Sequence, residues 1–89
     1  MSEVETKINE CVKEVMSYRS YAASEVDRIV NSLKEIDNCV RHLDEENVEK
    51  ALRIATGLYQ EVASYSSYIP TTVKNLSFIQ AWLEKAKNR

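Results

Sequence analysis

Two cysteines and a single histidine are the side chains of this 89-residue chain best suited to metal binding or nucleophilic chemistry. Cys39 and His42 are three residues apart, so one turn of helix could aim a thiolate and an imidazole in the same direction. A structural zinc site needs four ligands, however, and a catalytic thiol needs an orienting third group and an oxyanion hole. Cys11 is 28 residues from Cys39 and there is no second histidine. We therefore expect no metal, no cofactor and no catalytic residue, and we expect both cysteines to be free thiols.

Tyrosines and serines gather in two short segments of the chain. Tyr18 and Tyr21 belong to the first segment, and Tyr65 and Tyr68 belong to the second. Tyrosine rings bury area while their hydroxyls find partners, so a band of Tyr and Ser is typical of a partly wet contact surface. The sequence therefore predicts that these four tyrosines bind a protein partner. Ordinary packing at the edge of a helical core is the alternative explanation.

The two tyrosine segments match each other at an offset of 47 residues. Residues 14–26 read EVMSYRSYAASEV and residues 61–73 read EVASYSSYIPTTV, with seven of thirteen positions identical. Both segments contain two consecutive four-residue steps in their hydrophobic pattern, a stutter that locally unwinds a supercoil or marks a bend. Two explanations remain open: chance similarity in a chain rich in Ser, Tyr and Val, or two related halves of the chain.

A hydrophobic seam through the first forty residues must position the first tyrosine segment. From Val4 to Leu43, apolar or near-apolar residues recur in steps of three and four, without glycine or proline. This spacing is typical of coiled coils and helical bundles. Ser2 and Glu5 have the form of a capping box, so we expect one helix over about residues 3–43. At 1.5 Å per residue it would be about 60 Å long.

Two shorter helices, over about 47–66 and 71–88, are expected in the rest of the chain. An acidic turn precedes the first of them, with Asp44 or Asn47 as its cap. Pro70 separates the two, and the threonines that follow it offer hydroxyls to cap the second.

Three arrangements of these helices are possible. The long helix can stay straight, it can break near residues 21–25 to give a four-helix bundle, or both halves can form a two-helix hairpin that dimerises. Ala22 and Ala23 are strong helix formers, which favours the straight helix. The expected fold is therefore all-α: a small antiparallel helical bundle in one domain, 1–89. Gly57, the only glycine, suggests a close helix crossing.

Composition argues against several classes of function. The formal net charge is −2, with 12 basic and 14 acidic residues, whereas a nucleic-acid binder of this size normally has a basic face. No apolar run approaches the roughly 20 residues of a membrane span. The polar, acidic start does not resemble a signal peptide. We therefore expect a cytoplasmic protein that binds neither nucleic acid nor membrane.

The leading hypothesis is a non-enzymatic helical protein–protein interaction module: a small adaptor, inhibitor or regulatory subunit. It would act through its amphipathic helix faces and the Tyr/Ser band, with another protein or a second copy of itself, as a homodimer, as the partner. A small DNA-binding regulator is a further alternative. It would use the basic residues of the last helix, which are Lys74, Lys85, Lys87 and Arg89.

The order helix, acidic turn, helix over about ninety residues resembles the ESAT-6/WXG100 family of small exported helical hairpins. Tyr21 and Glu25 form the Tyr-x-x-x-Glu spacing of that family's export signal, although within the first helix rather than at the tail. The turn lacks the family's Trp-x-Gly, since the only tryptophan is Trp82. The resemblance implies a two-helix hairpin, a dimeric four-helix assembly and export.

Overall fold

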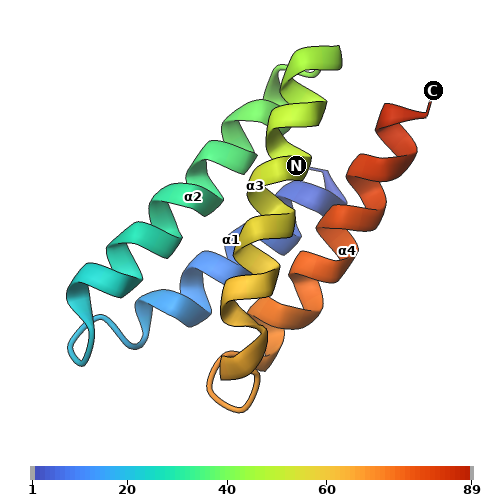
Figure 1. Ribbon diagram of the computed structural model, residues 1–89. Helices are drawn as coiled ribbons and strands as arrows, with labels where there is room; N and C mark the ends of the chain where they lie inside the picture. Colours follow the sequence, from blue (N-terminus) through green and yellow to red (C-terminus); the bar gives the residue numbers. More distant parts are fainter. Residues whose placement is uncertain (1, 89) are drawn as a thin grey trace.

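The computed structural model describes residues 2–88, which form four α-helices and, among these residues, no strand (Figure 1). The helices are α1 (Glu3–Met16), α2 (Ala23–Arg41), α3 (Glu45–Val62) and α4 (Pro70–Lys87), with a short 3-10 turn, Ala63–Tyr65, after α3. The molecule measures 40 × 22 × 20 Å along its principal axes. The expectation of an all-α helical bundle is confirmed.

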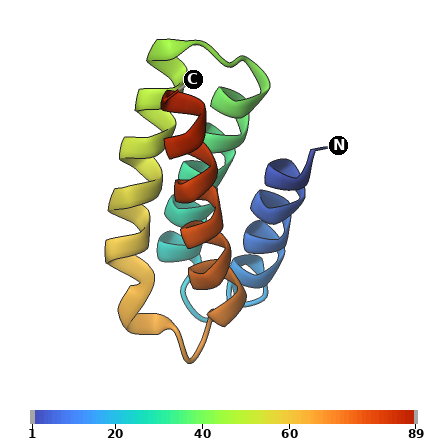
Figure 2. The ribbon, with the colours of Figure 1, turned by 90° about the vertical axis from the view of Figure 1, so that its right-hand side faces the viewer.

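The four helices form a ring. Helices α1 and α3 each pack mainly against α2 and α4. Successive helices run in opposite directions, and loops 17–22 and 63–69 lie together at the lower end of the bundle in Figure 1, which we call the loop end. The turned view in Figure 2 shows the α2–α3 turn and the end of α4 at the opposite end. This is the up-down-up-down arrangement of a four-helix bundle.

The prediction of one unbroken helix over 3–43 is wrong, because the chain leaves the helix after Met16 and re-enters it at Ala23. At the break, the Ser17 hydroxyl donates a 2.6 Å hydrogen bond to the Glu14 carbonyl, a local bond that competes with helix continuation. Helix propensities differ by only about 0.7 kcal/mol per residue among ordinary residues, so tertiary packing decides the outcome. Folding back covers a seam that a straight helix would leave half exposed.

The seam residues are buried on both sides of this break. They are Val4, Ile8, Cys11, Val15, Val26, Ile29, Leu33, Ile36 and Val40. Leu43, the last seam residue, is 48% exposed because it lies in the turn beyond α2. Each helix keeps a polar outer face, and none of the helices in the described part of the chain is long and apolar enough to span a membrane.

The predicted caps are confirmed for the first and third helices. Ser2 accepts a 3.3 Å hydrogen bond from the Glu5 amide, which begins α1. Of the two candidates for α3, Asp44 is the cap, and its carboxylate accepts a 2.7 Å bond from the Asn47 amide. Both side chains satisfy backbone N–H groups that have no partner within the helix.

The threonine cap expected for α4 is wrong, because Ile69 occupies the N-cap position and Pro70 the first turn. The capping group comes from another helix. The Glu14 carboxylate, at the end of α1, accepts hydrogen bonds from the Thr71 amide at 3.1 Å and the Thr72 amide at 2.6 Å. A carboxylate at a helix start is also favoured by the helix dipole. Glu14 therefore ties the end of α1 to the beginning of α4.

The close helix crossing suggested by Gly57 is also absent. Gly57 lies on the exposed side of α3, and a Cβ atom added there would meet nothing within 4 Å. Its backbone conformation is helical, and no glycine among the described residues has a positive φ. Neither packing nor conformation therefore requires glycine at this position.

The sequence match at an offset of 47 has a structural counterpart. Helices α2 and α4 begin at Ala23 and Pro70, which are 47 residues apart. The residues just before them share a backbone conformation: φ −150° and ψ 63° at Ala22, φ −130° and ψ 58° at Ile69. In the ring of helices, this correspondence moves α1 onto α3 and α2 onto α4. The two hairpins are thus related by an approximate twofold axis along the bundle.

The hydrogen bonds of the two loops agree as well. The Tyr18 carbonyl accepts bonds from the amides three and four residues later, at 2.9 and 3.2 Å. The Tyr65 carbonyl accepts the equivalent pair at 2.9 and 3.0 Å. Buried positions of α1 and α3 correspond pairwise: Val4 with Ala51, Ile8 with Ala55, Cys11 with Leu58 and Val15 with Val62. The two helical hairpins therefore share their loop hydrogen bonds and four pairs of buried positions.

Candidate functional site

The cysteines and the histidine do not form a reactive site in the structure. Cys11 and Cys39 are both buried and free, and His42 lies at the exposed end of α2. Burial raises the pKa of Cys11 to about 12, and burial likewise raises the pKa of Cys39. A thiol held in its neutral form is a poor nucleophile and a poor metal ligand. Within residues 2–88, no three His, Cys, Asp or Glu side chains are grouped to hold a metal ion.

The tyrosine segments, by contrast, meet around a hollow of about 320 Å³ at the loop end. The lining residues come from the end of α1, the first half of α2 and the two loops. They are Val15, Tyr18, Ala22, Glu25, Val26, Ile29, Tyr65, Tyr68 and Ile69, and we call this hollow the tyrosine groove. Three of the four tyrosines predicted to bind a partner therefore lie at one place. Tyr21, the fourth, points into solvent at 85% exposure and is not part of the lining.

One wall of the tyrosine groove is held by a contact between the two loops. The Tyr18 hydroxyl donates a 2.8 Å hydrogen bond to the Tyr68 carbonyl. Their rings meet edge to face, with centroids 6.5 Å apart and an interplanar angle of 89°. This is the geometry that aromatic pairs prefer. Tyr18 is consequently half-buried and fixed in place by the second loop.

The pair of tyrosines that corresponds to Tyr18 and Tyr68 under the twofold relation makes no such contact. Under the 47-residue offset, Tyr65 corresponds to Tyr18 and Tyr21 corresponds to Tyr68. Within residues 2–88, however, no ring contact joins Tyr65 to Tyr21, and neither hydroxyl has a hydrogen-bond partner. Tyr65 is 52% exposed at the rim of the groove. At the loop end, Tyr18 and Tyr68 are therefore in contact, whereas Tyr65 and Tyr21 are exposed to solvent.

The floor of the groove is apolar. Val15, Val26 and Ile29 form it, and each belongs to the hydrophobic core with under a tenth of its surface exposed. The sequence pattern marks these residues as core but does not show that a hollow lies against them. Ala22, which has only a methyl group, lines the hollow beside them. Comparison of Ala22 with its counterpart Ile69 is the sequence signal that could have located the groove.

The rim of the groove carries an excess of negative charge. Arg28 donates to Glu25 at 2.9 Å and to Glu61 at 2.9 Å, so one guanidinium bridges two carboxylates. The hydrogen bond with Glu61, followed by that with Glu25, raises the pKa of Arg28. Since one cation faces two anions, this cluster has a net charge of about −1.

A second ion pair fixes the first loop beside the groove. Arg19 binds Asp27 through two parallel hydrogen bonds of 2.9 and 3.1 Å. The hydrogen bond with Arg19 lowers the pKa of Asp27. The two charges balance each other, so this pair adds no net charge to the rim. Its effect is to hold the loop against the start of α2.

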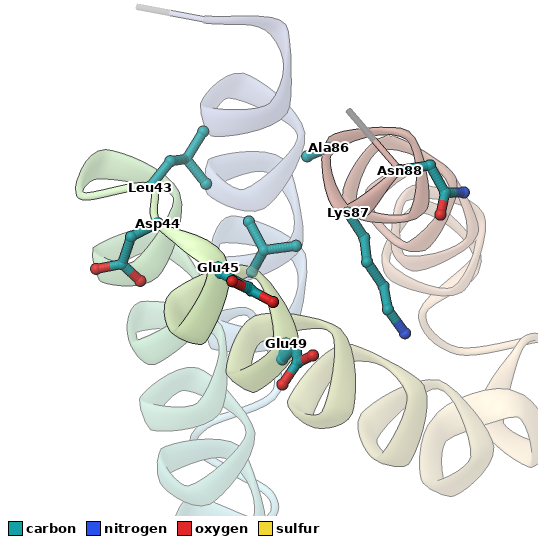
Figure 3. Close-up of a pocket in the computed structure, with 8 residues that line it drawn as sticks. Leu43, Asp44, Glu45, Glu49, Ala86, Lys87 and Asn88 are labelled. Atoms are coloured by element: carbon teal, nitrogen blue, oxygen red, sulfur yellow. The ribbon is translucent and has the colours of Figure 1, made fainter.

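Another hollow, of about 550 Å³, lies at the opposite end of the bundle, between the α2–α3 turn and the end of α4. In Figure 3 the carboxylates of Glu45 and Glu49 on α3 lie on one side of this gap and Lys87 of α4 extends along the other. Its full lining is Leu43, Asp44, Glu45, Val48, Glu49, Ala86, Lys87 and Asn88. Acidic residues at the first turn of α3 suit the helix dipole and need no ligand to explain them. The tyrosine groove is therefore the better candidate site.

The basic residues proposed for DNA binding are spread along α4. Lys74 lies near its start, whereas Lys85 and Lys87 lie in its last turn, where cations are favoured by the helix dipole. Lys87 also borders the acidic hollow of Figure 3. Arg89 is outside the described residues. The geometry adds nothing that favours a nucleic-acid interface.

No family model matches the chain, and no curated protein or solved structure is similar to it at a significant level. The fold implied by the ESAT-6/WXG100 resemblance also differs from the structure, because each half of the described chain contains two helices rather than one.

Proposed function

We propose that this protein is a non-enzymatic helical interaction module that binds a short segment of a partner protein in the tyrosine groove. The observation that carries the proposal is the convergence of Tyr18, Tyr65 and Tyr68 on an apolar hollow at the loop end. Tyrosine is enriched among the residues that dominate binding energy at protein interfaces. We propose that it acts in the cytoplasm, as an adaptor, inhibitor or regulatory subunit.

The size of the groove supports a short segment rather than a long helix as the occupant. A volume of about 320 Å³ is at the lower end of ligand sites and fits a few side chains. Covering Val15, Val26 and Ile29 with a partner removes apolar surface from water, which favours binding. The tyrosines at the rim of the groove offer rings and hydroxyls for further contacts. A partner segment that covers Tyr65 would bury a ring that is 52% exposed in the free protein.

Photo-crosslinking tests this function. A benzophenone amino acid replaces Tyr65 in the protein, which is expressed in its native host cells. The matched control places the same amino acid at Ser77, an exposed position on α4 away from the groove. We expect a discrete crosslinked product from position 65 and none from position 77, with the crosslinked segment identified by mass spectrometry.

Each outcome has a definite meaning. One defined partner, crosslinked only from position 65, supports the function, and a product of twice the chain mass identifies a second copy as the partner. Equal products from both positions, or none from position 65, overturn the proposal. Light scattering on the purified protein measures its mass in solution and so shows whether it is a monomer or a homodimer.

A further inference from the structure

We propose that the segment bound in the tyrosine groove inserts one isoleucine- or leucine-sized side chain over Ala22, beside a basic residue. This inference rests on the proposed function and names the chemistry of its partner. It follows from a break in the twofold relation between the two hairpins. The chain itself shows, in one half, what fills the place that is empty in the other.

The filled place is at Ile69. This side chain is 7% exposed and belongs to the hydrophobic core, so it closes the loop end where the second loop enters α4. Ala22 has nearly the same backbone conformation at the equivalent point before α2. Its methyl group is shorter than the Ile69 side chain, and the hollow lies beside it, with Val26 and Ile29 in the lining. The two side chains differ by the three carbon atoms of isoleucine beyond Cβ.

A hydroxyl at the rim of the groove is available to a bound segment. The Tyr18 hydroxyl donates to the carbonyl of Tyr68, the residue before Ile69. Its counterpart Tyr65 has a hydroxyl with no partner among residues 2–88. A carbonyl of a segment bound in the groove can accept a hydrogen bond from this hydroxyl, because Tyr65 lines the groove together with Ala22.

The charge of the rim indicates the neighbour of the aliphatic residue. Glu25 lines the groove, and with Glu61 it shares a single cation, Arg28. A lysine or arginine in the bound segment would balance the remaining negative charge. An acidic segment would be repelled by the same carboxylates. Charge complementarity therefore favours a basic aliphatic segment over an acidic one.

The probe is the synthetic peptide acetyl-Ser-Ser-Tyr-Ile-Lys-amide, which copies residues 66–69 and adds a lysine. Nuclear magnetic resonance titration of the full chain measures its binding. We expect about millimolar affinity, as suits a contact of one or two side chains, with shifts at Ala22, Val26 and Ile29. Replacing the peptide's isoleucine by alanine should weaken binding about tenfold, since one buried aliphatic side chain is lost. Replacing its lysine by glutamate should also weaken it, more strongly at low salt.

The decisive protein variant is Ala22→Ile, which supplies the missing side chain from within. We expect it to fold, to unfold at a higher temperature than the parent chain, and to lose binding of the peptide by at least about tenfold. The control Ala81→Ile adds the same atoms at an exposed position of α4 and should leave peptide binding unchanged. Unchanged binding by Ala22→Ile, or equal binding of the isoleucine and alanine peptides, overturns the inference.

Failure of this inference can be told apart from failure of the proposed function. The photo-crosslink at position 65 is repeated in the Ala22→Ile background. If the crosslink persists there, the groove binds a partner but not through an aliphatic side chain over residue 22, and only the inference falls. If no crosslink forms from position 65 in the parent chain either, the function falls, and the inference falls with it.

Discussion

Glu14 and Thr72, 58 residues apart, are joined by a 2.6 Å hydrogen bond from the Thr72 amide to a Glu14 carboxylate oxygen. The second oxygen of the same carboxylate accepts from the Thr71 amide at 3.1 Å. These bonds connect the first helix of the ring to the last, which no loop connects. Because the first amides of a helix have no partner within it, the carboxylate satisfies groups that would otherwise depend on water.

Substitution of Glu14 by glutamine should therefore destabilise the bundle. An amide accepts through one oxygen only and carries no charge to oppose the dipole of α4, so we expect a loss of about 1–2 kcal/mol in unfolding free energy. Urea unfolding followed by circular dichroism measures it. Glu84→Gln, at an exposed position of α4, is the control and should change stability by less than about 0.5 kcal/mol. Equal effects of the two changes would contradict the capping role.

The two equivalent tyrosines should respond differently to loss of their hydroxyls. Tyr18→Phe removes the hydrogen bond to the Tyr68 carbonyl, and we expect it to cost about 1 kcal/mol of unfolding free energy. Tyr65→Phe removes a hydroxyl without a partner among the described residues, so its effect should be near zero. Chemical denaturation of both variants makes the comparison. A larger loss at Tyr65 than at Tyr18 would show that the loop end is arranged differently in solution.

Gly57→Ala should stabilise the protein. Alanine is favoured over glycine in a helix interior by about 0.8–1 kcal/mol, and at Gly57 nothing obstructs the added methyl group. The reverse change at an exposed position of α4, Ala81→Gly, should destabilise by a similar amount. Thermal unfolding of the two variants measures both changes. A destabilised Gly57→Ala variant would mean that some contact in solution uses the bare backbone of α3.

The buried thiol of Cys11 predicts how stability depends on pH in the alkaline range. Its pKa is raised from 9.0 to about 12, chiefly by burial, so the folded protein retains a proton that the unfolded chain loses. The stabilising contribution is complete below about pH 9 and falls as the pH rises toward 12. The unfolding free energy of the parent should fall relative to that of Cys11→Val over this interval. Urea titrations from pH 8 to about pH 10.5 measure it.

The same burial predicts slow alkylation. At pH 8 the native protein should react with iodoacetamide far more slowly than the urea-unfolded chain, because the thiols of Cys11 and Cys39 are buried and neutral. Mass spectrometry counts the modified thiols. Rapid modification of Cys11 in the native protein would contradict the packing of α1 against α4.

Sequence periodicity predicted the buried faces of the helices but not where the first helix ends. Steps of three and four residues also run from Val15 to Val26, across the break, so the presence of such steps does not by itself reveal it. Local propensity pointed the wrong way, because Ala22 favours a helix in isolation. The doubled four-residue step shared with the segment around Ile69 was the better indicator. Its meaning depends on contacts between distant parts of the chain.

The tyrosine groove could be predicted only in part. Residue type and clustering identified Tyr18, Tyr65 and Tyr68 as a set, and the structure brings these three together. Tyr21 is also a tyrosine in the same segment, but its side chain points away from the groove. Side-chain direction in a loop is not set by a helical or strand period, so the sequence could not show this. The hollow itself depends on a small residue at position 22. A small residue does not stand out in a hydrophobic pattern, so only the comparison of Ala22 with Ile69 could have indicated it.

The ring of helices closed by Glu14 does not depend on which of the two hairpins comes first in the chain. The start of α1 and the end of α4 lie at the same end of the bundle as the short α2–α3 turn, and the approximate axis carries that turn onto the open junction between them (Figures 1 and 2). A circularly permuted chain, with residues 44–88 preceding 2–43 through a short linker, would give every helix the neighbours that it has now. Its topology would be unchanged, because exchanging two equivalent hairpins along the chain is the same operation as turning the bundle by half a revolution.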